Sequence, residues 1–177
     1  MTHTTPVVDV HLILRDGDKI LLSQRGGPYG YGRWHAPSGK LDPGETLTAA
    51  TAREAYEETG VVVDPHDLRL VHTVHHHQGD DAPDRIGFFF EATTWENEPI
   101  NREPDKCLRL AWFAVHDLPE DLIPYPEAGL RAYLHGDTGI TMHGWPHPAR
   151  TTPGTEPPRP DASGFGRTER YFSGGKA

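Results

Sequence analysis

The chain has 177 residues, of which 35% are hydrophobic, and its formal net charge is −9. This length suits one domain with a hydrophobic core and a further short segment. The acidic balance argues against a nucleic-acid polymer as partner, because phosphate backbones are bound by basic surfaces. No hydrophobic run approaches the ~20 residues that a membrane span needs. The one cysteine, Cys107, excludes an intrachain disulfide.

Polar residues interrupt every hydrophobic run near the N-terminus, among them Asp9, His11 and Arg15. A secretory signal peptide is therefore not expected. A single cysteine also suits a reducing compartment. Together these features predict a cytoplasmic location.

The first expected elements form a hairpin. Apolar residues alternate from Val8 to Leu14, which is the period of a half-buried strand. Asp16-Gly17 predicts a turn, and Lys19 to Gln24 the returning strand. Residues 25–45 are rich in glycine and proline and predict a long ordered loop.

A helix is expected from Thr46 to Thr59, with Gly60 placed to end it. Further strands and a second helix follow. The expected strands are 61–63, 68–76, 85–93, 108–115 and 140–145, and the second helix is 127–135. Helices interspersed with strands fit an α/β sandwich, in which helices flank a curved mixed sheet.

The composition changes after Trp145. Residues 146–177 are rich in proline and glycine and contain few large aliphatic residues. Such a segment cannot bury enough apolar surface to offset its ordering entropy. We therefore predict a domain over residues 1–145 and a Pro/Gly-rich C-terminal tail over residues 146–177.

Three carboxylates stand close together in the first expected helix. Glu54, Glu57 and Glu58 are spaced i, i+3 and i+4, so all three are expected on one side of that helix. A like-charged i,i+4 pair costs roughly 0.2–0.5 kcal/mol on a solvated helix. A bound divalent cation would remove this cost, and oxygen ligands suit Mg²⁺ or Mn²⁺. The spacing predicts a metal-assisted phosphate enzyme.

The block around these carboxylates resembles the Nudix box. Gly39 is followed after five residues by Glu45, and seven residues later comes the run Arg53-Glu54-Ala55-Tyr56-Glu57-Glu58-Thr59-Gly60-Val61. Every charged and glycine position of the family pattern is filled, and Ala55 stands where a larger aliphatic residue is usual. An ordinary acidic helix would not also supply the glycines and the arginine. The resemblance covers roughly residues 6–145 and implies a Nudix-type α/β/α sandwich with a curved mixed sheet.

The resemblance also implies metal ligands. Glu57 and Glu58 would be the main ones, joined by the backbone carbonyl of Gly39. Glu54 would be either the general base or a ligand of a second metal ion. The implied cofactor is Mg²⁺, with Mn²⁺ as the alternative.

Two arginines receive roles from the same resemblance. Arg53 would orient the box carboxylates, with Glu45 and Glu57 as its partners. It therefore joins Glu54 and Glu57 in the expected catalytic group. Arg25 enters the long loop where MutT-like members place an arginine that contacts substrate phosphate.

Other residues admit two interpretations each. Lys40 is a surface lysine or a phosphate contact, and Trp34 packs under the loop or stacks on a base, with packing favoured. The run from Glu103 to Cys107 resembles a segment near the nucleotide cleft of MutT-type hydrolases. Glu103 and Asp105 are thus further candidate metal carboxylates, or else part of a charged turn at Pro104.

A histidine-rich stretch, with His11 as a possible further partner, raises the question of zinc. Consecutive histidines on a strand point to opposite faces, so at most two of three adjacent ones converge. This favours a polar strand or a cleft wall over a zinc site. The stretch consists of His72, His75, His76 and His77.

These observations predict a Mg²⁺-dependent Nudix pyrophosphohydrolase of the MutT-like branch. It would cleave a nucleoside di- or triphosphate, or a related nucleoside diphosphate derivative, at a phosphoanhydride bond and release a nucleoside monophosphate. We expect a small-molecule substrate and a monomer or homodimer. The alternatives are a non-nucleotide diphosphate, such as an isoprenoid or a biosynthetic intermediate, and a nucleotide sensor without turnover. The intact carboxylate cluster argues against the sensor.

Overall fold

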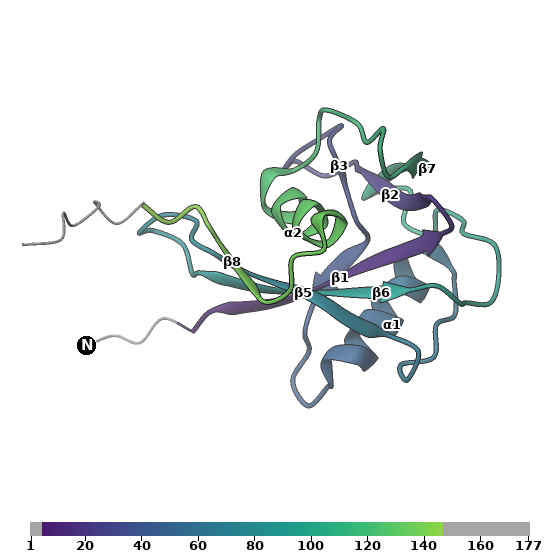
Figure 1. The fold of residues 1–177 in the computed structure, drawn as a ribbon, viewed down its shortest axis with the longest axis horizontal. Coiled ribbons are helices and arrows are strands. Elements are labelled where there is room, and N and C mark those ends of the chain that lie inside the picture. Colours follow the sequence, from purple (N-terminus) through teal and green to yellow (C-terminus); the bar gives the residue numbers. More distant parts are fainter. Residues whose placement is uncertain (1–4, 147–177) are drawn as a thin grey trace, which may run out of the picture. The chain divides into compact units, whose positions relative to one another are not determined.

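The computed structural model describes residues 5–146, which form eight strands and two helices (Figure 1). Except for Pro146, the predicted tail lies outside the described residues, and the boundary at residue 145 stays a prediction. No helix in the described part is long and apolar enough to cross a membrane. In chain order the elements are β1 (Val7–Asp16), β2 (Lys19–Arg25), β3 (Trp34–His35), β4 (Ser38–Lys40), α1 (Leu47–Thr59), β5 (Arg69–His76), β6 (Arg85–Ala92), β7 (Cys107–Ala114), α2 (Pro124–His135) and β8 (Ile140–His143).

The strands build one mixed sheet in the order β3-β2-β1-β6-β5-β8, and β4 and β7 pair beside this path with β1 and β2. β1 runs parallel to β6, and β5 runs parallel to β8. Figure 1 shows α2 above the central strands and α1 below them. The expected α/β sandwich with a mixed sheet is therefore confirmed.

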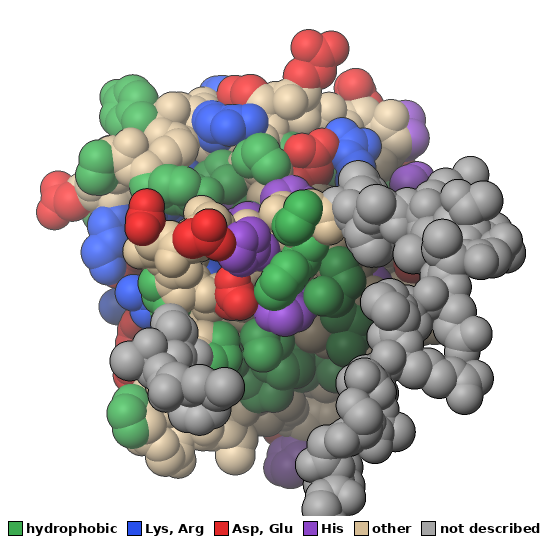
Figure 2. Space-filling view, turned by 90° about the vertical axis from the view of Figure 1, so that its left-hand side faces the viewer, with side chains coloured by type: hydrophobic (Ala, Val, Ile, Leu, Met, Phe, Trp, Pro, Cys, Tyr) green, Lys and Arg blue, Asp and Glu red, His purple; other side chains and the backbone are tan. Residues whose placement is uncertain are grey.

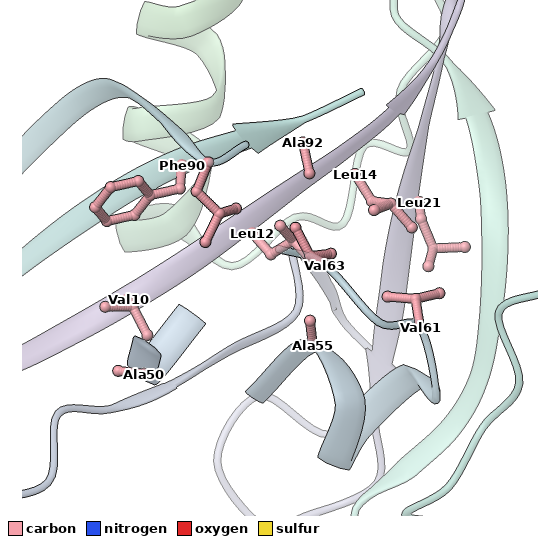
Figure 3. Packing of buried hydrophobic residues seen from close by; sticks show 11 residues of the cluster. Val10, Leu12, Leu14, Leu21, Ala50, Ala55, Val61, Val63, Phe90 and Ala92 are labelled. Carbon is pink, nitrogen blue, oxygen red and sulfur yellow. The ribbon is translucent and has the colours of Figure 1, made fainter. Parts of the chain in front are cut away.

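Two hydrophobic clusters fill the two sides of the sheet. On the α1 side, Val10 and Leu12 of β1 pack with Ala50 and Ala55 of the helix (Figure 3). The cluster on the other side includes Leu130 of α2 and buried residues of β1, β2, β5 and β6. The small alanines let α1 lie close to the sheet, which brings its carboxylates near the strands.

β1 differs from the half-buried strand that its alternation predicts. The intervening residues Asp9, His11 and Ile13 are buried too, at 3%, 3% and 0% exposure. The reason lies in the tertiary structure, because helix α2 and the hydrophobic cluster beneath it cover this face of the sheet. Two polar side chains of β1 therefore lie in the protein interior.

Helix α1 begins and ends where the sequence predicts. The side chain of Thr46 accepts a hydrogen bond from the backbone N–H of Ala49. At the other end, Gly60 has φ +75° and its N–H donates to the carbonyl of Tyr56. A left-handed residue at this position is most easily a glycine.

Three segments depart from expectation. The long loop contains β3 and β4, and β4 pairs Gly39 with Val10 of β1. Helix α2 starts at Pro124, earlier than predicted, because proline is well tolerated in a first helical turn. Residues 61–63 form no named strand, only an isolated bridge between Val62 and Glu96.

Candidate active site

Gly39 brings β4 directly against helix α1. An ideal Cβ built on Gly39 would lie 1.8 Å from Cδ of Glu54. No real side chain could occupy that space, so only glycine lets the Glu54 carboxylate lie over the β4 backbone. This close approach gives a physical reason for the first glycine of the box.

Arg53 binds three box carboxylates at once. It donates from Nε and Nη2 to Glu45 at 2.9 and 3.0 Å. Nη1 donates to Glu54 at 2.7 Å and to Glu57 at 3.2 Å. These ion pairs raise the pKa of Arg53, and the bonds from Arg53 lower the pKa of Glu45. Glu45 and Glu57 are the partners the sequence predicts, and Glu54 is an additional one.

Glu58 lies in a different environment. Its Oε2 accepts a hydrogen bond from the backbone N–H of Ser38 at 3.0 Å. Desolvation by burial raises the pKa of Glu58 to about 8, and the negative charges of Glu54 and Glu103 add to this. The carboxyl therefore favours its neutral form unless a cation comes close.

The three box glutamates do not share one environment, although helical spacing predicts one side. Glu54 rests on Gly39, with its pKa raised mainly by desolvation while Arg53 opposes that shift. Glu58 is bound to Ser38 of the same strand. The side chain of Glu57 is 49% exposed and is joined to Glu54 only through Arg53. The inner pair is therefore Glu54 and Glu58.

The residues of the box differ in how well they suit a metal ion. Within residues 5–146, no three His, Cys, Asp or Glu side chains stand in a geometry that would hold an ion. In the box, Arg53 occupies an oxygen of Glu54 and one of Glu57. The donors are nevertheless all carboxylate and carbonyl oxygens, which suit a hard divalent cation. A cation beside Glu58 would offset the desolvation that raises its pKa, so the residues fit such an ion.

The other candidates fall into three groups. Arg25 and Lys40 line the pocket beside the box. Trp34 is buried and meets Phe113 edge to face, as the packing interpretation expects. Glu103 binds Lys106 at 2.7 Å and is close enough to raise the pKa of Glu58.

The histidine stretch lies against β8 and neighbouring groups instead of converging on His11. Figure 2, viewed from the left-hand side of Figure 1, shows histidines among hydrophobic and acidic side chains at this end of the molecule. His72, His75 and His76 belong to β5, and His77 follows its last residue. Their nearest hydrogen-bonding contacts are His72 to Thr141 at 2.8 Å, His76 to His143 at 2.9 Å and His77 to Asp84 at 2.8 Å.

A pocket of about 400 Å³ opens beside the box. Ser38 and Gly39 form part of its wall, so the pocket borders the backbone that carries Glu54 and Glu58. Asp9, Arg85 and Tyr125 form another part. These three residues are absent from the sequence-based candidates. No local signal marks them, because their convergence depends on how β1, β6 and α2 meet.

Comparison with known proteins places this site in a family. The NUDIX domain family matches residues 4–133. The 8-oxo-dGDP phosphatase NUDT18 of Homo sapiens is 31% identical over 113 residues, 63% of this chain and 33% of the relative. The oxidized purine nucleoside triphosphate hydrolase of Danio rerio is 27% identical over 129 residues, 70% of this chain and 79% of the relative.

Solved structures agree. The crystal structure of a MutT NUDIX hydrolase from Burkholderia pseudomallei matches with a TM-score of 0.67 and 29% identity, covering 72% of this chain and 97% of that one. The chain spans only about a third of the human relative's length. The family match nevertheless includes the whole carboxylate block and most of the sheet. The chain belongs to the Nudix hydrolase family.

Proposed function

We propose that this protein is a Mg²⁺-dependent pyrophosphohydrolase, with Mn²⁺ as the alternative ion, that releases a nucleoside monophosphate from a nucleoside di- or triphosphate. One observation carries the proposal. Glu54 and Glu58 contact the β4 backbone at Gly39 and Ser38, and these two β4 residues line a pocket of about 400 Å³, a volume typical of small-molecule sites. The acting form would be a cytoplasmic monomer or homodimer.

The metal would be held by Glu57, Glu58 and the carbonyl of Gly39, and when bound it supplies charge neutralisation on the phosphates. For Glu57 this requires exchange of its bond to Arg53, which is 3.2 Å long and exposed to solvent. Arg53 would keep Glu54 in place through its shorter bond. These residues therefore orient the ligands before the reaction starts.

Glu54 is suited to accept the proton of the attacking water. Arg53 binds its Oε1, which leaves Oε2 for that proton. Desolvation raises the pKa of Glu54, and a carboxylate with a raised pKa is a better general base. The alternative role, as ligand of a second metal ion, uses the same position over Gly39.

Arg25 and Lys40 would bind the phosphate chain from the pocket wall. They would hold one phosphorus in line with the water, which is the main contribution that positioning makes to such reactions. The activities named for two relatives, one on 8-oxo-dGDP and one on oxidized purine nucleoside triphosphates, support a nucleotide substrate.

A panel of nucleoside di- and triphosphates and isoprenoid diphosphates, assayed with and without Mg²⁺, tests the proposal. We expect Mg²⁺-dependent release of a nucleoside monophosphate, with pyrophosphate as the other product from a triphosphate. Orthophosphate as the first product from a triphosphate would contradict attack at an inner phosphorus. Turnover of isoprenoid diphosphates alone would identify the alternative substrate, and nucleotide binding without turnover would identify a sensor.

A further inference from the structure

An ion pair between buried Asp9 and partly buried Arg85 lies in the wall of the pocket. Arg85 donates to Asp9 from Nε at 2.6 Å and from Nη2 at 2.5 Å. The hydroxyl of Tyr125 donates to the same carboxylate at 3.2 Å. The pair has no net charge, and the guanidinium keeps further N–H donors beyond the two that Asp9 uses.

His11 stands two residues further along the same face of β1 and also lines the pocket. Its ring stacks on Phe89 at 4.3 Å and meets Tyr125 edge-on at 5.4 Å. Both ring nitrogens are buried, and neither has a hydrogen-bond partner among the described residues. Burial lowers the pKa of His11 to about 3, so the ring is neutral near pH 7. It offers one N–H donor and one acceptor nitrogen.

A comparable buried histidine does have hydrogen-bond partners. His72 on β5 is as buried as His11, at 3% exposure. Its two nitrogens lie 3.2 Å from the carbonyl of Asp137 and 2.8 Å from Oγ1 of Thr141. A buried polar group without a partner is unfavourable and rare. His11 is therefore an exception that calls for a partner from outside the chain.

Gly87 leaves room for Tyr125 and His11 to lie close to β6. An ideal Cβ on Gly87 would lie 2.2 Å from the hydroxyl of Tyr125 and 3.1 Å from Nε2 of His11. Any side chain at this position of β6 would push both groups away. The glycine thus lets the polar atoms of three elements gather in one place.

We propose that His11, together with the Asp9–Arg85 pair, determines substrate specificity. These residues would bind the uncharged base of a nucleotide, at the edge of the base where an oxo group stands beside a ring N–H. This rests on the proposed function, whose substrate it narrows. Arg85 would donate to the oxo oxygen, and an acceptor on His11 or Asp9 would take the N–H. An alkyl chain would leave the His11 nitrogens and the remaining N–H donors of Arg85 without a partner, so the same residues would reject an isoprenoid.

A pair of variants separates binding from folding. His11→Leu removes both unpartnered nitrogens, so its melting temperature should equal or exceed that of the wild type. Its KM for GTP should rise at least about 10-fold while kcat stays within a few-fold. The control, His72→Leu, loses partnered nitrogens, so its melting temperature should fall while its KM changes little. An unchanged KM in His11→Leu would overturn the proposal.

Product binding gives a readout that needs no turnover. GMP, AMP and dimethylallyl monophosphate are titrated into the metal-free Glu58→Gln protein by calorimetry. GMP should bind at least about 10-fold more tightly than AMP and the alkyl phosphate, and adding His11→Leu should abolish that preference. Equal binding of GMP and AMP, or tighter binding of the alkyl phosphate, would refute the inference. Selective GMP binding without any hydrolysis by the wild type would instead refute the proposed function alone.

Discussion

The two sides of the sheet carry opposite kinds of polar chemistry. On the α1 side, Glu54, Glu57 and Glu58 concentrate like charges, and burial raises the pKa of Glu58. On the α2 side, Asp9 and Arg85 cancel each other, and burial lowers the pKa of His11. The first arrangement calls for a cation. The second suits an uncharged group with donors and acceptors.

The two sides also differ in how the chain builds them. The carboxylates come from one helix and the loop before it, so neighbouring positions in the sequence meet in space. The other side joins β1, β6 and the start of α2, which lie far apart in the sequence. We infer that the reaction is encoded locally, whereas the choice of substrate depends on packing between distant segments.

The largest expected effect is the loss of the Glu58 charge. Glu58→Gln keeps the size of the side chain and its contact with Ser38, so the fold should persist. Without that carboxylate, kcat with Mg²⁺ should fall at least about 100-fold, a barrier increase of roughly 2.7 kcal/mol. Steady-state kinetics over a range of Mg²⁺ concentrations measures this. Near wild-type turnover would contradict the assignment of Glu58 as a metal ligand.

The same variant has a pH signature in the metal-free protein. The folded pKa of Glu58 is about 8, above its usual value of 4.5. Between these values the unfolded chain releases the proton while the folded protein retains it, so wild-type stability falls as pH rises. Glu58→Gln should therefore gain stability relative to wild type from pH 4.5 to 8, as measured by denaturant titration. A constant difference would show that Glu58 is not desolvated.

A smaller effect is expected from closing the space over Gly39. Gly39→Ala places a methyl group where Glu54 lies, so the carboxylate must move. A displacement of about 1 Å at a catalytic group can cost roughly 100-fold in rate, and we expect a loss between 10-fold and that value. Gly27→Ala is the matched control, because its Cβ would meet only Arg25 Nη2 at 3.9 Å. Equal activity of the two variants would show that Glu54 does not need its place on β4.

Two buried histidines are expected to reduce the stability of the protein in acid. His11 and His35 have folded pKa values of about 3 and about 4, both lowered mainly by burial from 6.5. Below pH 6.5 the unfolded chain takes up protons that the folded protein does not, so the free energy of unfolding decreases as the pH is lowered. Each histidine contributes at most about 1.4 kcal/mol per pH unit. His11→Leu should show a shallower decline than wild type between pH 6 and 4, and an identical slope would count against a buried neutral His11.

The smallest effect on activity is expected from removal of the predicted tail. Its composition predicts that residues 146–177 lie outside the catalytic domain. Truncation after Trp145 should leave kcat within a few-fold of the full chain. Gel filtration of both forms would also show whether the tail changes the oligomeric state. A collapse of activity or a dissociated oligomer would show that the tail is structural.

Much of the fold could be predicted because its signals are local. Thr46 and Gly60 mark the ends of α1 through their own hydrogen bonds and backbone angles. The strands expected from Lys19, Arg85 and Leu108 follow from hydrophobic runs between turns, and the last of them begins one residue earlier, at Cys107. The start of α2 was misplaced because Pro124 and Pro126 resemble loop residues, although proline fits a first helical turn.

By itself the sequence determined the family, the carboxylate block and the likeness to a metal-assisted hydrolase, because those residues are neighbours along one helix and one loop. Helical spacing did not reveal that Glu57 faces solvent while Glu54 and Glu58 meet β4, since that depends on where Gly39 pairs with β1. The tertiary structure alone decided that Asp9 and His11 are buried. Alternation along a strand indicates which residues share a face, but only the element packed on that face decides whether it meets water or the protein interior.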